Sequence, residues 1–359
     1  MEPEMQVKIE QIRAMLAKRG FGGVLMESQP NLAWLTGGRH FVNVASTNGL
    51  GAIWVGADHV ELIVNNIEGE RLWQEEGGAV ACDVLTVYPW YREEKRTALV
   101  QERMRRVKAA TDQDLSAEFL ELRLRLTPEE QARYRVLGRL AGEAVETAAC
   151  EACSGQSEYE LAGLIAKASY ERGLEPLVCL VGADERATLR RHPLPTEKKV
   201  EHYALLVLSA RRFGLVASVS RAVYLGKAPV ELIQKQESVN RVLARMLEAS
   251  HPGVTLGAVF QAGLVGYAEA GFPDEWQAHH QGGLAGYQSR EVKATAESGR
   301  SVEAGMALAW NPTLQGSKAE ETFLLTPEGL EDLTATGNWP MQRVTVGERL
   351  FELPWILES

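Results

Sequence analysis

The chain has 359 residues, of which 45% are hydrophobic and 24% are charged, a composition typical of a soluble globular protein with room for two domains. Its net charge of −10 excludes nucleic acid as the expected partner, because a phosphate backbone requires a basic face. No apolar run reaches the roughly 18 residues that are needed to cross a bilayer, so no membrane partner is expected either.

The first third of the chain alternates helical and extended patterns. Apolar residues from Met5 to Leu16 recur at helical spacing, and Gly20 ends this predicted helix. Further along, an apolar run at 22–26 is followed by predicted strands at 53–55 and 60–64 and by predicted helices at 68–76 and 93–109. Such alternation indicates an α/β domain, which we place at residues 1–126.

A second domain, residues 127–359, begins at a strong helix start. Thr127 is an N-cap, Pro128 fits the first helical position, and Glu130 completes a capping box. From there, two helices followed by strands occur twice, offset by roughly a hundred residues. The helices are predicted at 128–150, 158–172 (capping box Ser157 and Glu160), 230–250 and 256–270 (N-cap Thr255), with strands to about 224 and 326. This repeat predicts an α+β domain with internal pseudo-twofold symmetry and a site between its halves.

Two hairpins make the symmetry testable. In the first, a turn centred between Arg212 and Phe213 would place Val207 opposite Ser218. In the second, a turn near Gln315-Gly316 would place Asn311 opposite Glu320. The two pairs would occupy equivalent positions in the two halves.

Three histidines, His192, His279 and His280, are candidates for proton transfer or metal binding. His279 and His280 precede the glycines of Gln281-Gly282-Gly283, which would let a ligand approach the backbone closely. Imidazole transfers protons near neutral pH and is a common metal ligand. His192 lies before Pro193, which favours an extended backbone; the alternative is a loop histidine packed at a domain edge.

Four motifs stand out along the chain: Asn31-Leu32-Ala33-Trp34-Leu35-Thr36-Gly37, Arg191-His192-Pro193-Leu194-Pro195-Thr196, His280-Gln281-Gly282-Gly283-Leu284 and Glu320-Glu321-Thr322-Phe323-Leu324-Leu325-Thr326. Together they resemble the pita-bread family, which includes methionine aminopeptidase, aminopeptidase P, proline dipeptidase and the metal-free creatinase. The four motifs occur in the family's order and spacing, and the resemblance covers nearly the whole chain. The resemblance implies an α/β N-terminal domain, an α+β pita-bread C-terminal domain, and a homodimer.

The resemblance also implies where metals would bind. The family's peptidases hold two divalent ions with two aspartates, one histidine and two glutamates, positions that fall here on Val207, Ser218, His280, Asn311 and Glu320. Three of the four carboxylates are therefore absent, and Glu320 alone would leave about three positive charges uncompensated. No register shift restores the first two ligands, because residues 203–224 contain no Asp or Glu. We expect a degenerate dinuclear site and no cofactor; a single manganese, cobalt or zinc ion stays open as an alternative.

The same resemblance suggests catalytic roles for His192, His280 and Glu320, with His192 contacting substrate and, as in creatinase, transferring a proton. Lys318 and Glu320 share one strand face, so Lys318 or a cationic substrate group could balance a buried Glu320. The remaining candidates for substrate binding are His279, Arg191, Asp184, Arg186, Tyr287, Arg290, Glu291 and Asn311. Asp184 and Arg186 could equally belong to a solvated loop.

Three functions remain open at this stage. The leading hypothesis is a metal-independent protein that binds, and as an enzyme would hydrolyse, a small amide, amidine or dipeptide-like molecule in a His/Glu site. The second is an Xaa-Pro dipeptidase with an atypical metal site. The third is a non-catalytic peptide-binding relative of the peptidases. In each case the ligand is a small molecule or a short peptide.

The remaining signals concern compartment and packing. Residues 1–4 lack the basic and then apolar pattern of a secretory signal, so we expect a cytoplasmic protein. Four scattered cysteines exclude a disulfide framework, and Cys150 and Cys153 are expected to be half-buried thiols or a redox pair. The apolar tail 338–359 could pack on its own domain or on a neighbour.

Overall fold

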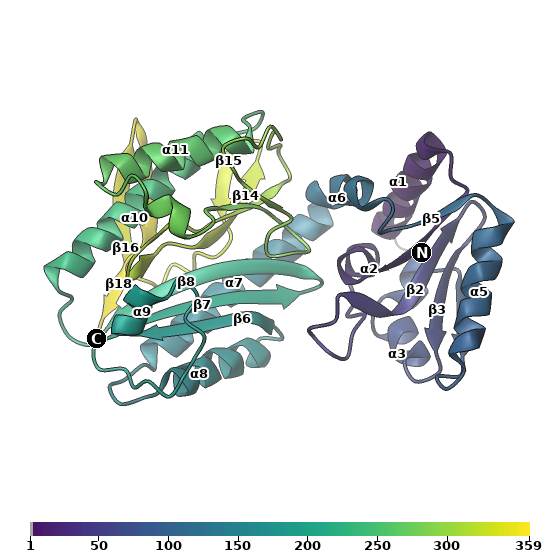
Figure 1. Cartoon of the computed structure of the whole chain (residues 1–359), viewed down its shortest axis with the longest axis horizontal. Helices are drawn as coiled ribbons and strands as arrows, with labels where there is room; N and C mark the ends of the chain where they lie inside the picture. The colour runs from purple at the N-terminus through teal and green to yellow at the C-terminus, as the bar shows by residue number, and fades with distance from the viewer. Residues whose placement is uncertain (1–2) are drawn as a thin grey trace. The chain divides into compact units, whose positions relative to one another are not determined.

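The computed structural model describes residues 3–359 and divides into two units (Figure 1). The first comprises the residues up to Glu129 with Phe213–Leu215, and the second comprises Glu130–Arg212 with Val216–Ser359. Met1 and Glu2, on which part of the predicted N-terminal pattern falls, lie outside the described residues. Within residues 3–359, no helix has both the length and the apolar character required to cross a membrane.

The first unit is built on a mixed five-stranded sheet in the order β4-β3-β2-β1-β5. Its strands are β1 (Gly23–Ser28), β2 (Asn48–Gly56), β3 (Val60–Asn65), β4 (Val84–Tyr88) and β5 (Ala109–Thr111). Its helices are α1 (Pro3–Arg19), α2 (Gln29–Thr36), α3 (Gly69–Gln74), α4 (Gly78–Ala81), α5 (Glu93–Arg106) and α6 (Ser116–Leu124). Helix α5 covers one sheet face, where Val100 and Met104 pack against Leu25 and Trp54.

Most predicted elements of this unit are confirmed, and the errors are local. Helix α1 ends before Gly20, which adopts a positive φ of 72°. Helix α5 ends at Arg106, three residues before the predicted end, because Val107 is already extended and leads into β5. The sequence patterns did not reveal α2, which starts two residues before the Asn31–Gly37 motif and ends at Thr36, where Gly37 caps it with a φ of 71°.

The second unit confirms the predicted repeat. Its first half contains α7 (Pro128–Cys150), α8 (Glu158–Glu171), β6 (Glu175–Ala183), β7 (Tyr203–Arg212) and β8 (Leu215–Tyr224). Its second half contains α10 (Val230–Ala249), α11 (Leu256–Glu269), β9 (Gly282–Ala285), β11 (Ala307–Trp310) and β14 (Glu321–Thr326). The strands run in the order β6-β7-β8 in one sheet and β9-β11-β14 in the other, so the halves have the same topology.

The predicted helix caps at Ser157 and Thr255 are both present. The Ser157 side chain accepts a hydrogen bond from the backbone N–H of Glu160, whose carboxylate accepts one from the N–H of Ser157. The Thr255 hydroxyl accepts a hydrogen bond from the N–H of Ala258. These local interactions explain why the helix starts could be read from the sequence.

The register of the first hairpin differs from the prediction, whereas that of the second agrees. Phe213 and Gly214, both with positive φ, form the turn between β7 and β8, so the turn centre lies one residue later than predicted. Ser209, not Val207, lies opposite Ser218, and their hydroxyls are 2.9 Å apart. In the second hairpin, the pairing of Trp310 with Glu321 places Asn311 opposite Glu320, as predicted.

Strands β8 and β14 join the two halves of the second unit. The Ser220 hydroxyl accepts a hydrogen bond of 3.0 Å from the N–H of Glu320, and the Ser220 N–H donates one to the Glu320 carbonyl. Next to them, the buried guanidinium of Arg221 forms ion pairs with Glu146 of α7 and Glu321 of β14. These contacts hold Glu320 and the start of β14 against the first half.

The C-terminal tail packs on its own domain. Strands β16 (Met341–Val346) and β17 (Arg349–Pro354) form a hairpin, and β18 (Ile356–Glu358) pairs in parallel with β8. The remaining short elements are α9 (Glu185–Leu189), the 3-10 helix η1 (Glu275–Ala278), β10 (Val292–Lys293), β12 (Thr313–Leu314), β13 (Ser317–Lys318) and β15 (Gly329–Asp332). Cys150 and Cys153 are free and exposed, not half-buried as expected, because Cys150 ends α7 and Cys153 lies in the turn that follows.

Candidate functional site

A cavity of about 280 Å³ in the second unit gathers all five positions to which the metal ligands were assigned. Val207 comes from β7, Ser218 from β8, His280 precedes β9, Asn311 follows β11, and Glu320 precedes β14. The pseudo-symmetric topology brings these elements together from both halves. The other lining residues are Val178, Leu180, His192, Ser209, Ser289, Arg290, Lys293 and Lys318.

Glu320 is buried and bound by two cationic side chains. Its Oε1 lies 2.9 Å from Nη2 of Arg290, and its Oε2 lies 3.1 Å from Nζ of Lys318. All three side chains are at most 6% exposed. Burial by itself would raise the pKa of the Glu320 carboxyl, but the charges of Lys318 and Arg290 outweigh it and lower the pKa to about 2. Burial also lowers the pKa of Lys318, against the influence of Glu320.

Three imidazoles lie at one side of the site. The Nε2 atoms of His192 and His279 are 2.9 Å apart, within hydrogen-bonding distance, and the rings of His279 and His280 stack with centroids 4.4 Å apart. Burial, reinforced by Lys318, lowers the pKa of His279 to about 2; burial and Arg290 lower that of His280 to about 4. Burial also lowers the pKa of His192. The rings are therefore neutral at physiological pH.

The side chains at the five positions do not fit a dinuclear metal centre. Val207 offers no lone pair, and Ser218 and Asn311 are neutral donors. The one carboxylate, Glu320, already has both oxygens occupied by Lys318 and Arg290. These ammonium and guanidinium charges would repel a divalent ion at the same place.

A single ion on the histidines is a separate case. The ring nitrogens of His192, His279 and His280 lie within 4.8 Å of one another. However, the planes of His279 and His280 differ by only 25°, and an imidazole lone pair lies in the plane of its ring. Both rings can thus reach one ion only after one of them rotates.

Several of the residues predicted to bind substrate have other partners. The Asp184 carboxylate accepts hydrogen bonds from three backbone N–H groups, at residues 201–203, and Arg186 pairs with the buried Glu158. Neither lines the cavity, so the structure does not support their assignment to substrate binding. Arg191, which pairs with Glu275 and donates to Thr313, lies outside the lining as well.

Tyr287 and Glu291 are also directed elsewhere. The Tyr287 hydroxyl donates to Glu130 of α7 at 2.5 Å, and the Tyr287 N–H donates to Glu291. Of the predicted substrate-binding residues, Arg290, Asn311 and Lys318 do line the cavity, whereas His279 reaches it only through His192 and His280.

Sequence reasoning missed three polar residues of the lining, Lys293, Ser209 and Ser289. Ser209 could have been found from the correct hairpin register, which pairs it with Ser218. Lys293 could have been found from the short strand β10, which pairs with β9 directly after the histidine loop. Ser289 has no comparable signal.

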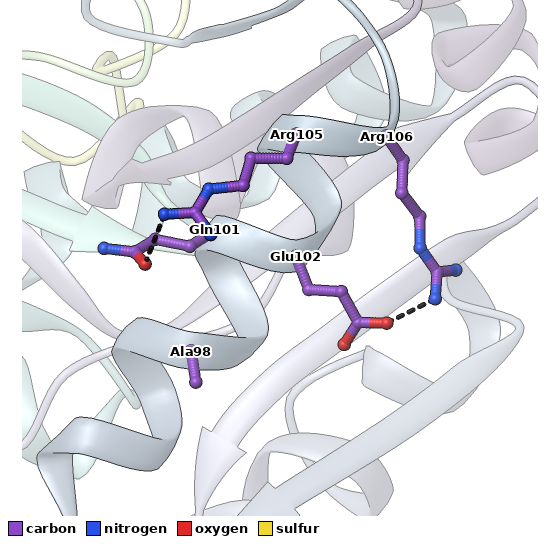
Figure 2. Close-up of a pocket in the computed structure, with 5 residues that line it drawn as sticks. All are labelled: Ala98, Gln101, Glu102, Arg105 and Arg106. Atoms are coloured by element: carbon purple, nitrogen blue, oxygen red, sulfur yellow. Dashed lines mark hydrogen bonds and ion pairs between the residues drawn. The ribbon is translucent and has the colours of Figure 1, made fainter.

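A second hollow lies on the outer face of α5 in the first unit, as Figure 2 shows. There Arg105 donates to Gln101 at 3.3 Å and Arg106 pairs with Glu102, each one helical turn apart. Such i, i+4 pairs are typical of a solvated helix face. This hollow therefore carries no chemistry comparable with the cavity of the second unit.

A family model and solved structures both relate this chain to metallopeptidases and prolidases. A model of metallopeptidase family M24 matches residues 132–327. Among solved structures, an Xaa-Pro dipeptidase from Bacillus anthracis is 18% identical with a TM-score of 0.78, and covers 99% of this chain and 100% of its own. The prolidase from Pyrococcus horikoshii OT3 is also 18% identical, with a TM-score of 0.76 and coverages of 92% and 98%.

A third similar structure is the N-terminal domain of the FACT complex subunit SPT16 from chickpea (Cicer arietinum). It is 12% identical with a TM-score of 0.70, and covers 93% of this chain and 96% of its own. A search of curated proteins found no significant match.

Proposed function

We propose, from the premise that the chain belongs to metallopeptidase family M24, that it binds a small amide or dipeptide-like molecule without the family's pair of metal ions. The pita-bread fold predicted from the motifs is confirmed by the similarity to prolidase structures over nearly the whole chain. The single observation that carries the proposal is the state of Glu320. Its charge is balanced by Arg290 and Lys318, in the place where its relatives would need metal ions.

The site retains groups that could hydrolyse an amide. His192 lines the cavity, and its Nε2 lies 2.9 Å from that of His279, a hydrogen bond that can orient the His192 ring. In hydrolysis, His192 would take a proton from water as the oxygen attacks the amide carbon. The cationic charge of Arg290 and Lys318 would stabilise the oxyanion, and the proton would then pass to the leaving nitrogen.

The structure changes one part of this hypothesis. A cationic amidine was expected to pair with Glu320, but Lys318 and Arg290 already occupy both of its oxygens. A second cation next to them would be repelled. The amidine alternative is therefore weaker than the amide or dipeptide-like alternative.

We expect the full chain to retain no manganese after incubation with excess metal and desalting, because its donor set lacks three carboxylates and contains two cations. Elemental analysis of the folded protein measures this. In the same preparation, no Xaa-Pro dipeptide should be cleaved in saturating manganese, cobalt or zinc. About two ions per chain would contradict the proposal and support the metallopeptidase alternative.

A non-catalytic role is the second candidate, favoured by Val207, Ser218 and Asn311, which stand in the cavity where the family's peptidases would have metal-binding carboxylates. Replacing His192 by Ala separates the two candidates. For an enzyme, turnover of a responsive small amide should fall about 100-fold with binding retained, and rates should be measured on a panel of dipeptides and N-acyl amino acids. His251→Ala, a change at an exposed histidine, is the control and should leave the rate unchanged. A ligand that is bound but never consumed by the unaltered chain would favour the binding module.

A further inference from the structure

The cavity carries an excess of positive charge. Its lining contains three basic side chains, Arg290, Lys293 and Lys318, and a single carboxylate, Glu320. With neutral histidines the formal charge of the lining is therefore three minus one, or +2. Protonation of His192 or His280 would only increase it. A concave site lined by one sign of charge concentrates molecules of the opposite sign.

The three cations are not equivalent. Arg290 and Lys318 are buried and bound to Glu320, so they contribute to the field of the site while being held in place. Lys293, in β10, is exposed, and among residues 3–359 no carboxylate forms an ion pair with it. Lys293 is thus the cation that can contact a ligand directly.

The rest of the lining suits one end of an acidic molecule. Ser209, Ser218 and Ser289 supply hydroxyls, which can donate hydrogen bonds to a carboxylate. Val178, Leu180 and Val207 supply apolar surface. A volume of about 280 Å³ holds a molecule of roughly dipeptide size.

We propose that this cavity recognises the carboxylate of a small N-acyl amino acid or dipeptide, with Lys293 as its direct ionic contact and Arg290 and Lys318 supplying the field. This inference rests on the proposed function, which supplies the amide of the ligand, and it adds a carboxylate to the same ligand. In this proposal, basic side chains of the protein and the ligand carboxylate lie where a dinuclear peptidase would have its metal ions.

Calorimetric titration of the full chain tests the proposal with two matched probes, N-acetylglycine and its neutral amide, N-acetylglycinamide. N-Acetylglycine should bind at least about tenfold more tightly than the neutral amide, and its affinity should fall with added salt. Lys293→Met should weaken N-acetylglycine binding about tenfold. Lys227→Met, at a lysine whose side chain is 91% exposed outside the cavity, should leave it unchanged.

Equal affinity for both probes, no binding of either at tens of millimolar, or an undiminished affinity in Lys293→Met would each overturn the proposal. Elemental analysis of the same samples separates this failure from a failure of the proposed function. Metal-free protein that shows no carboxylate preference rejects the acidic ligand alone, whereas retention of two metal ions rejects the metal-independent function itself.

Discussion

Replacing Glu320 by Gln is expected to lower the free energy of unfolding by about 3–5 kcal/mol, the cost typical of breaking a buried ion pair. The change leaves the ammonium of Lys318 and the guanidinium of Arg290 close together and uncompensated, with side chains that are 4% and 6% exposed. Urea unfolding of the full chain at neutral pH measures the loss. If metal ions rather than these side chains balanced Glu320 in the protein, the loss in metal-free buffer would be much smaller.

Two further variants make this result specific. Glu352→Gln, at an exposed pair with Arg343, should cost less than about 1 kcal/mol, as surface ion pairs do. Combining Lys318→Met with Glu320→Gln should recover part of the stability, because one stranded cation is removed. A double variant no more stable than Glu320→Gln would show that charge compensation is not the cause.

The same variant has a defined pH dependence. The pKa of Glu320 is lowered to about 2 in the folded chain, so its contribution to stability is present above the ordinary carboxyl pKa and is lost as the pH falls through about 2. The difference between the parent and Glu320→Gln should therefore be constant from neutral pH to about pH 5 and shrink below it. A difference that grew on acidification would contradict this assignment.

Replacing Arg221 by Met is expected to lower the free energy of unfolding by a similar amount, about 3–5 kcal/mol, because it leaves buried anions without their cation. The change leaves the carboxylates of Glu146 and Glu321 in the interior without the guanidinium that contacts both. Because Arg221 is next to Ser220, which bonds to the Glu320 backbone, the variant should also weaken binding of N-acetylglycine in the cavity. Urea unfolding and calorimetric titration provide the two readouts.

A matched control is available on α7. Arg139 pairs with Glu143 one turn along the same helix as Glu146, but its side chain is 56% exposed. Arg139→Met should change stability by less than about 0.5 kcal/mol and leave ligand binding intact. If Arg221→Met were equally mild, the buried network would not be what holds the two halves at the site.

Local signals in the chain were enough to predict the long helices and the two central hairpins, but not the short strands and helices. Helices α7, α8 and α11 begin where Pro128, Ser157 and Thr255 indicate, because a helix start is specified by its first few residues. The turn of the second hairpin could also be placed, since Gly316 takes a positive φ of 85° that few other residues adopt. The first hairpin was misplaced because both Phe213 and Gly214 have positive φ, and Phe rarely does.

The candidate site was only partly predictable. The motifs identified the positions Val207, Ser218, His280, Asn311 and Glu320, all of which line one cavity. Asp184, Tyr287 and Glu291, however, were assigned to it only because they carry polar groups near the motifs. Their hydrogen bonds go to other parts of the fold, and a side chain's direction depends on packing that spacing along the chain does not encode.

By itself, the sequence determined the family, the repeated architecture and the absence of three metal-binding carboxylates, because each of these depends on residue identity and order. Only the tertiary structure decided what compensates Glu320. Lys318 lies two residues away and was a foreseeable partner, but Arg290 reaches the same carboxylate from 30 residues away. Charge balance in a buried site is set by distances in space, and so the cationic character of this cavity emerged only when the two halves were folded together.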